Sequence, residues 1–155
     1  MILRTNTGNE DFVELTRKLD LELAERDGEE HLFYDQFNKI DLLKYAVVAY
    51  SDKKSVGCGV MKEHEQNTME IKRMYVVQHS RGQGIAREIL SELEKWTSEL
   101  NYAMCILETG KKQPEAIELY KRSGYKLIPN YGQYAGVENS VCFEKQLKDP
   151  GNFEY

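Results

Sequence analysis

The sequence has few of the residues that build metal centres or disulfide frameworks. It contains three cysteines and three histidines in 155 residues, and it has neither a Cys-x-x-Cys pair nor a His-Glu-x-x-His motif. Cys58, Cys105 and Cys142 are far apart, and each lies in an apolar run, which favours buried reduced thiols over a disulfide or a nucleophile. We therefore expect no metal ion.

Long hydrophobic runs and an excess of positive charge are also missing. Nowhere do about 18 apolar residues follow one another, and the N-terminus has no basic region followed by a long apolar run, so we expect a cytoplasmic protein that does not contact a membrane. The formal net charge is −5. This charge predicts no general attraction to nucleic acid and would favour a cationic substrate.

Length and composition predict one compact domain. A chain of 155 residues is long enough to bury a substantial core, and 41% apolar with 30% charged residues is typical of a globular protein. The sequence shows neither an internal repeat nor a low-complexity segment. We place a single domain at residues 1–148 and a short C-terminal tail at residues 149–155.

A glycine-rich turn lies at the centre of the sequence, between a predicted strand that ends at Val77 and a predicted helix that begins at Ile85. Gly82 and Gly84 lack a Cβ atom, so a bulky anion can approach backbone N–H groups at the positive end of the helix dipole. Arg81 adds a guanidinium that can pair with phosphate oxygens. The turn predicts a phosphate-binding site, although such glycines can also form only a tight turn.

The remaining hydrophobic pattern predicts alternating strands and helices. The predicted strands lie at residues 1–6, 44–50, 55–62, 68–77, 102–109, 125–128 and 140–147, and the predicted helices at residues 9–24, 85–100 and 113–124. Polar connections at residues 51–54 and 63–67 are short enough to make the three middle strands an antiparallel meander. The strand at residues 102–109 follows a strand and a helix, so we expect it to be parallel to the strand at residues 68–77.

Two further features concern residues 20–41 and the start of the last helix. Carboxylates alternate with aromatic residues between Asp20 and Asp41, which predicts either a solvated acidic surface of helix and loop or one wall of a site for a cationic substrate. Pro114 suits the first position of a helix, and Gly124 suits the position just after its end.

The element order and two motifs resemble the Gcn5-related N-acetyltransferases (GNAT superfamily), and the resemblance covers nearly the whole chain. The cofactor signature of that family is Gln or Arg, two residues, Gly, one residue, and Gly or Ala. It is matched by Arg81-Gly82-Gln83-Gly84-Ile85-Ala86. A second family pattern is matched by Ala116, Leu119, Tyr120, Gly124 and Tyr125.

The resemblance implies an α+β fold, an α/β/α sandwich. Its twisted sheet would be mixed and mostly antiparallel, with six to seven strands, about four helices and a central splayed pair of parallel strands. It also implies acetyl-CoA as co-substrate, without a metal. The pyrophosphate would bind the N–H groups of Gly82, Gln83, Gly84, Ile85, Ala86 and Arg87, and the pantetheine would bond the main chain of Met74, Tyr75 and Val76. Gln113 stands where many members carry an Asn that helps to hold the cofactor.

The resemblance further implies two catalytic residues. Tyr120 would protonate the leaving sulphur, and Glu70 would accept the proton of the amine, directly or through water, with Glu108 as a substitute. Each has a structural alternative, since Tyr120 also suits the buried face of a short helix and Glu70 also suits an edge or solvent face. A backbone N–H near Tyr75 would stabilise the oxyanion.

The acceptor and the class of protein stay open at this point. The resemblance favours an N-acetyltransferase acting on a small-molecule or protein amine, bounded by residues 23–41 and by the loop that holds Tyr131 and Tyr134. It is compatible with a homodimer. A non-catalytic acyl-CoA-binding module is the alternative. A dinucleotide-binding oxidoreductase fits less well, because Arg87 occupies the third glycine position and an antiparallel meander precedes the turn.

Overall fold

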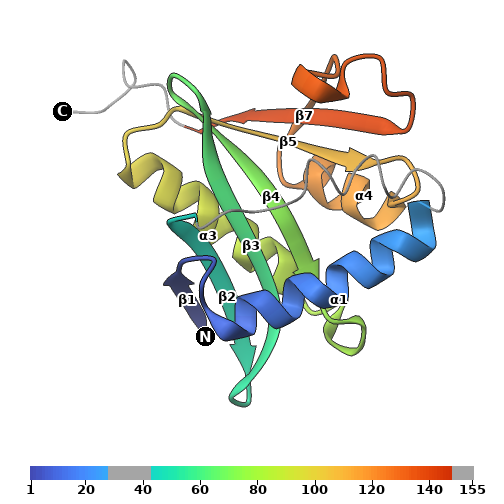
Figure 1. The fold of residues 1–155 in the computed structure, drawn as a ribbon. Coiled ribbons are helices and arrows are strands. Elements are labelled where there is room, and N and C mark those ends of the chain that lie inside the picture. The colour runs from blue at the N-terminus through green and yellow to red at the C-terminus, as the bar shows by residue number, and fades with distance from the viewer. Residues whose placement is uncertain (28–42, 148–155) are drawn as a thin grey trace. The chain divides into compact units, whose positions relative to one another are not determined.

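The computed structural model describes residues 1–27 and 43–147 (Figure 1). Its α-helices are α1 (Glu10–Asp27), α3 (Ile85–Glu99) and α4 (Pro114–Arg122), and its 3-10 helices are η2 (Gln78–Ser80) and η3 (Gly132–Tyr134). Its strands are β1 (Ile2–Thr5), β2 (Tyr45–Ser51), β3 (Lys54–Glu65), β4 (Thr68–Val76), β5 (Met104–Gly110), β6 (Lys126–Ile128) and β7 (Ser140–Gln146). Among the described residues, no helix is both long and apolar enough to cross a membrane.

The strands form one seven-stranded sheet in the order β1-β2-β3-β4-β5-β7-β6. The strand β2 pairs antiparallel with β1 and with β3, and β7 pairs antiparallel with β5 and with β6. The strands β4 and β5 are parallel, as the strand–helix–strand order predicts. The predicted mixed, mostly antiparallel sheet is therefore confirmed.

The chain divides into two compact units, which we describe separately. The first unit comprises residues Met1–Lys62 and Ile71–Leu93, and the second comprises Glu63–Glu70 together with the chain from Glu94 onward. Because the boundaries fall inside β3, β4 and α3, each of these elements contributes residues to both units.

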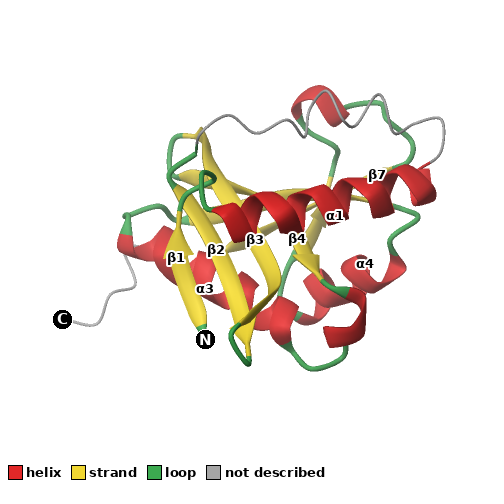
Figure 2. Ribbon diagram, turned by 60° about the horizontal axis from the view of Figure 1, so that its bottom comes forward, coloured by secondary structure: helices red, strands yellow, loops and turns green. Residues whose placement is uncertain are grey.

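In the first unit, helices cover both faces of the sheet. Figures 1 and 2 show α1 crossing one face of β2 and β3, with the N-terminal part of α3 behind the other. Phe12, Leu15 and Leu19 form the buried stripe of α1, at the spacing of one helix face. The Asn9 side chain accepts a hydrogen bond from the Phe12 N–H (3.0 Å), which satisfies one of the free donors at the start of α1.

Glycines on β3 let α3 approach the sheet closely. A Cβ atom at Gly57 would lie 2.8 Å from Ile89 Cδ1, and one at Gly59 would lie 2.9 Å from Leu93 Cδ1. Ile89 and Leu93 are four residues apart, on one face of α3, and are fully buried. The absence of a side chain at Gly57 and at Gly59 thus makes room for α3, the helix that follows the glycine-rich turn.

In the second unit, β7 lies between β5 and β6, and α4 has the predicted ends. Pro114 occupies the first turn of α4, and Gly124 has a φ of +92°, the left-handed conformation expected just past a helix. Glu94 accepts hydrogen bonds from Tyr125 (2.9 Å) and Lys145 (2.9 Å). Asn67 O accepts from the N–H groups of Ala103 and Met104, which joins the start of β4 to the chain entering β5.

One predicted connection is wrong. Residues 63–67 were expected to be a polar loop, but β3 continues to Glu65 and only Gln66 and Asn67 turn the chain. Asn67 adopts a φ of +68°, in the left-handed region, which Asn tolerates better than most residues. Glu63 and Glu65 are exposed and His64 is half-buried, so these polar residues follow the alternation of a strand.

The three cysteines are free and buried, as predicted. Burial raises the pKa of Cys58 to about 12 and the pKa values of Cys105 and Cys142 to about 11. A raised pKa leaves little thiolate at neutral pH, so these residues are poor nucleophiles.

We expect Gly57→Ala to lower the free energy of unfolding by about 1–3 kcal/mol, because overpacking a core has that cost. The new Cβ would lie 3.0 Å from Tyr75 O, a backbone atom, and 2.8 Å from Ile89 Cδ1. Gly59→Ala is the matched control, since its nearest atom is the flexible Met74 Sδ at 2.7 Å, and its cost should be smaller. Urea unfolding measures both; a Gly57→Ala protein as stable as the wild type would contradict this packing.

Candidate functional site

The glycine-rich turn is held in place by backbone hydrogen bonds in the first unit. Val77 N–H donates to Val56 O (2.8 Å), and within the turn Ser80 N–H donates to Val77 O (2.9 Å). Gly82 and Gly84 have φ values of +80° and +83°, the left-handed region that glycine adopts without steric cost. The helix α3 then starts at Ile85.

The backbone N–H groups at the start of α3 are available to a ligand. In residues 1–27 and 43–147, the structure records no protein acceptor for the N–H groups of residues 82–87, and the first bond into the helix is Glu88 N–H to Gly84 O (3.0 Å). A Cβ atom at Gly82 or Gly84 would meet no atom within 4 Å, so the space beside the turn is open. These donors, at the positive end of a 15-residue helix, suit an anion such as a pyrophosphate.

Arg81 is engaged within the protein. Its Nε donates to Val76 O (2.8 Å), its Nη2 pairs with Glu22 Oε1 of α1 (2.7 Å), and its guanidinium lies 5.6 Å from the centre of the Tyr75 ring. Arg81 thus ties the turn to β4 and α1. Its predicted contact with phosphate stays a prediction, and one edge of its guanidinium is already used.

Arg73, which precedes the predicted pantetheine-binding residues Met74 to Val76, is a residue that the sequence did not point to. Arg73 is 8% exposed, and its Nη2 pairs with Asp20 (2.7 Å) and donates to Thr16 O (3.1 Å). Its φ of +59° interrupts the extended backbone of β4 just before Met74. The available signal was an arginine in the middle of a predicted strand.

Tyr120 lies in the second unit and is 5% exposed. Its ring packs against Tyr125 (centroids 5.8 Å apart) and Phe143 (6.0 Å). Burial, and then the nearby Glu108 carboxylate, raise the pKa of Tyr120 far above that of a free phenol. The raised pKa keeps the hydroxyl protonated at neutral pH, so Tyr120 has a proton to share there and does not act as a base.

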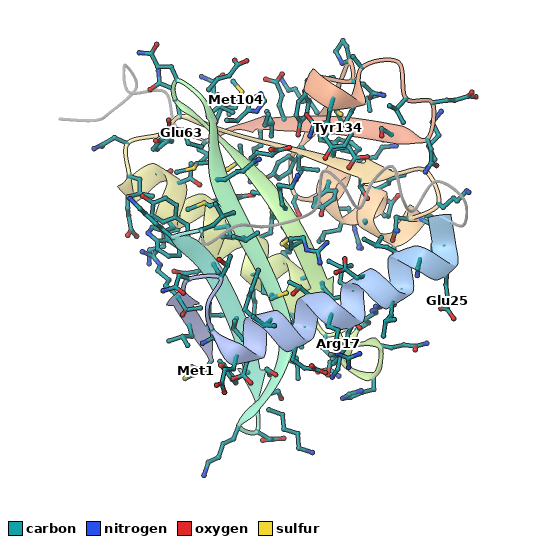
Figure 3. All side chains as sticks on the ribbon, in the orientation of Figure 1. Met1, Arg17, Glu25, Glu63, Met104 and Tyr134 are labelled. Carbon is teal, nitrogen blue, oxygen red and sulfur yellow. The ribbon has the colours of Figure 1, made fainter. Side chains whose placement is uncertain are left out.

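Glu70 is buried, with 3% of its surface exposed. The edge or solvent-face alternative for Glu70 is therefore wrong. Its Oε2 accepts a hydrogen bond from the Tyr131 hydroxyl (2.8 Å), which belongs to the loop expected to border the amine. The neighbouring Tyr134, labelled in Figure 3, is 2% exposed, and both Glu108 and Glu70 raise its pKa after burial does. The second unit thus gathers two carboxylates and several tyrosines.

The predicted residues are divided between the two units. Those assigned to the cofactor lie in the first unit, except Gln113, which precedes α4 in the second. Tyr120, Glu70 and Glu108 lie in the second unit. Of the acidic segment 20–41, residues 28–41 lie outside the described residues. Within the described part of the chain, no group of three or more His, Cys, Asp or Glu side chains could hold a metal ion.

Comparison with known proteins identifies the family to which this chain is similar. The sequence model of the acetyltransferase (GNAT) family matches residues 10–125. The IAA acetyltransferase of Azospirillum brasilense is 33% identical over 93 residues, which are 59% of this chain and 61% of that protein. YsnE of Bacillus subtilis (strain 168), an uncharacterized N-acetyltransferase, is 28% identical over 101 residues, 64% of this chain and 67% of its own.

Solved structures share the fold. A Klebsiella pneumoniae protein assigned to the acyl-CoA N-acyltransferases superposes with a TM-score of 0.80 at 27% identity, covering 96% of this chain and 97% of the other. A GNAT family acetyltransferase from Elizabethkingia anophelis, solved with acetyl-CoA bound, has a TM-score of 0.66 at 17% identity over 95% and 97% of the two chains. With a family match that spans most of the sequence, this chain belongs to the GNAT family of acetyltransferases.

Proposed function

We propose that this protein is an acetyl-CoA-dependent N-acetyltransferase that moves the acetyl group to a primary amine of a small molecule or a protein. The observation that carries the proposal is the row of backbone N–H groups at residues 82–87, which have no recorded acceptor in the described residues and face open space at Gly82 and Gly84. Membership of the acetyltransferase family supports the same ligand.

The first unit would bind the cofactor. The N–H groups of residues 82–87 hold the pyrophosphate, and the main chain of residues 74–76 bonds the pantetheine in the manner of an added strand. Arg81 would support the turn through its hydrogen bonds to Val76 O and Glu22. Bound acetyl-CoA supplies an acetyl group activated as a thioester.

The second unit would carry the proton transfers. An amine with a pKa of about 10 is mostly protonated at pH 7, so the attacking nitrogen must first lose a proton, and Glu70 accepts it. As the nitrogen–carbon bond forms, the carbon–sulphur bond breaks, and the sulphur takes the proton of Tyr120. The nitrogen then loses its second proton, through water, to the Tyr120 phenolate, and Glu70 releases the first proton to solvent. The products are an amide, a thiol and one proton, with Glu70 and Tyr120 back in their starting states.

We expect Gly84→Val to weaken CoA binding about tenfold or more, a change of at least about 1.4 kcal/mol, because a branched side chain is strained at this φ and fills the approach to the N–H groups. Gly136→Val is the matched control, since Gly136 has a φ of +80° and equally open surroundings in the second unit. Calorimetric titration with CoA measures both. An equal loss in the two variants would point to general destabilisation and against the turn.

We expect Tyr120→Phe to lower kcat by about 10²-fold or more, because general acid catalysis contributes that much, while CoA binding stays near the wild-type value. The measurement is thiol release from acetyl-CoA across a panel of amines. Full turnover in this variant would show that Tyr120 is not the general acid. CoA binding by the wild type without thiol release on any amine would favour the alternative of a non-catalytic acyl-CoA-binding module.

A further inference from the structure

The hydrogen bond between Tyr131 and Glu70 has no counterpart in the motifs of the sequence. We propose that Tyr131 is a positioning residue, whose hydroxyl orients the Glu70 carboxylate and holds it ionised as the acceptor of the amine proton. This inference rests on the proposed function and adds to it a residue of the loop between β6 and β7. All the residues that carry it belong to the second unit.

The contact is short, and the carboxylate is buried. The Tyr131 hydroxyl donates to Glu70 Oε2 at 2.8 Å, although the two residues are 61 positions apart in the sequence. Within the described residues, it is the only side chain recorded as donating to Glu70. Burial of a carboxylate without such a donor is costly, so this bond bears directly on whether Glu70 stays ionised. The bond uses Oε2, and in residues 1–27 and 43–147 no donor to Oε1 is recorded, so Oε1 can take the incoming proton.

Tyr131 is held in one place by its surroundings. Its ring meets the His64 ring edge-on, with centroids 5.2 Å apart, and the Tyr134 ring at 5.7 Å and 85°. Tyr134 N–H donates to Tyr131 O (2.9 Å). The preceding Asn130 side chain donates to the carbonyls of Val137 (2.9 Å) and Ser140 (3.1 Å), which closes the loop on itself. A hydroxyl presented by a fixed ring sets the direction of the carboxylate it bonds.

Tyr131 is also a permanent donor. Burial, followed by the Glu70 carboxylate, raises the pKa of Tyr131 well above the usual range of a phenol, so the hydroxyl keeps its proton at neutral pH. Burial, followed by Glu108 and then Glu70, raises the pKa of Tyr134, and burial raises that of Cys142 to about 11. Tyr131, Tyr134 and Cys142 are therefore neutral at pH 5–9. The other titratable side chains beside these tyrosines in this unit are His64, next to Tyr131, and Glu108, next to Tyr134.

The first experiment compares pH–rate profiles. Removing a donor from the charged form disfavours that form, so we expect the acid limb of the kcat profile to move up by about one pH unit in Tyr131→Phe. Tyr125→Phe is the matched control, because it removes an equally short bond, to Glu94 at 2.9 Å, from a buried tyrosine of the same unit. An unmoved limb in Tyr131→Phe, or an equal shift in both variants, would overturn the proposal.

The second experiment is a double-mutant cycle. If Tyr131 acts through Glu70, Tyr131→Phe should change kcat by less than about twofold in a Glu70→Gln background, although it lowers kcat by up to about tenfold on the acid limb of the profile when Glu70 is present. Equal factors in the two backgrounds would mean that Tyr131 acts independently of Glu70 and would refute the positioning role.

The third measurement does not depend on turnover. The carboxyl ¹³C resonance of Glu70, identified by its loss in Glu70→Gln, is titrated in the wild type, in Tyr131→Phe and in Tyr125→Phe. We expect its midpoint to rise by about one pH unit in Tyr131→Phe alone. An unmoved midpoint counts against the coupling of Tyr131 to Glu70, whereas absence of thiol release from the wild type counts against the proposed function, so the two failures are distinguishable.

Discussion

The start of α3 sets the main constraint on this protein, because a helix leaves its first backbone N–H groups without partners. Here the preceding turn contributes further donors, so that residues 82–87 form an unbroken row with no recorded acceptor in the described chain. Two glycines in the left-handed region make this row and keep its surroundings open. An anion that binds these donors replaces water without requiring the backbone to rearrange.

The strand β4 links this turn to the proposed proton chemistry. Glu70 lies near its beginning, Arg73 interrupts its extended backbone, and Met74 to Val76 lead into the turn. Each part is fixed by a partner from elsewhere in its own unit: Tyr131 holds Glu70, Asp20 holds Arg73, and Arg81 binds Val76 O. One strand therefore carries both the proposed base and the proposed pantetheine-binding main chain.

The features that sequence predicted well are those with local causes. Gly82 and Gly84 are needed for the backbone they adopt, Pro114 and Gly124 mark the ends of α4, and the apolar stripe of α3 follows the helical period. The succession of β2, β3 and β4 and the parallel alignment of β5 with β4 followed from the connections between them, whereas the sequence did not predict β7 between β5 and β6. In each case the signal lies within a few residues of the structure it specifies.

The features that sequence missed depend on pairs of distant residues. Arg81 meets Glu22 across 59 positions, and Tyr131 meets Glu70 across 61. Neither pair has a periodicity or a motif, because it is register and loop conformation in the folded chain that bring the side chains together. The mistaken loop at residues 63–65 has a related cause, since charged residues on the exposed face of a strand look like a turn in the sequence.

The most direct test of the account is a titration of the ¹⁵N-labelled protein with CoA, followed through its backbone amide resonances. The largest shifts should occur at residues 82–87 and should saturate together. Pantetheine, the part of CoA that lacks the pyrophosphate, should not produce them. Saturable shifts confined to other parts of the chain, with residues 82–87 unchanged, would contradict the central claim that these N–H groups bind the diphosphate.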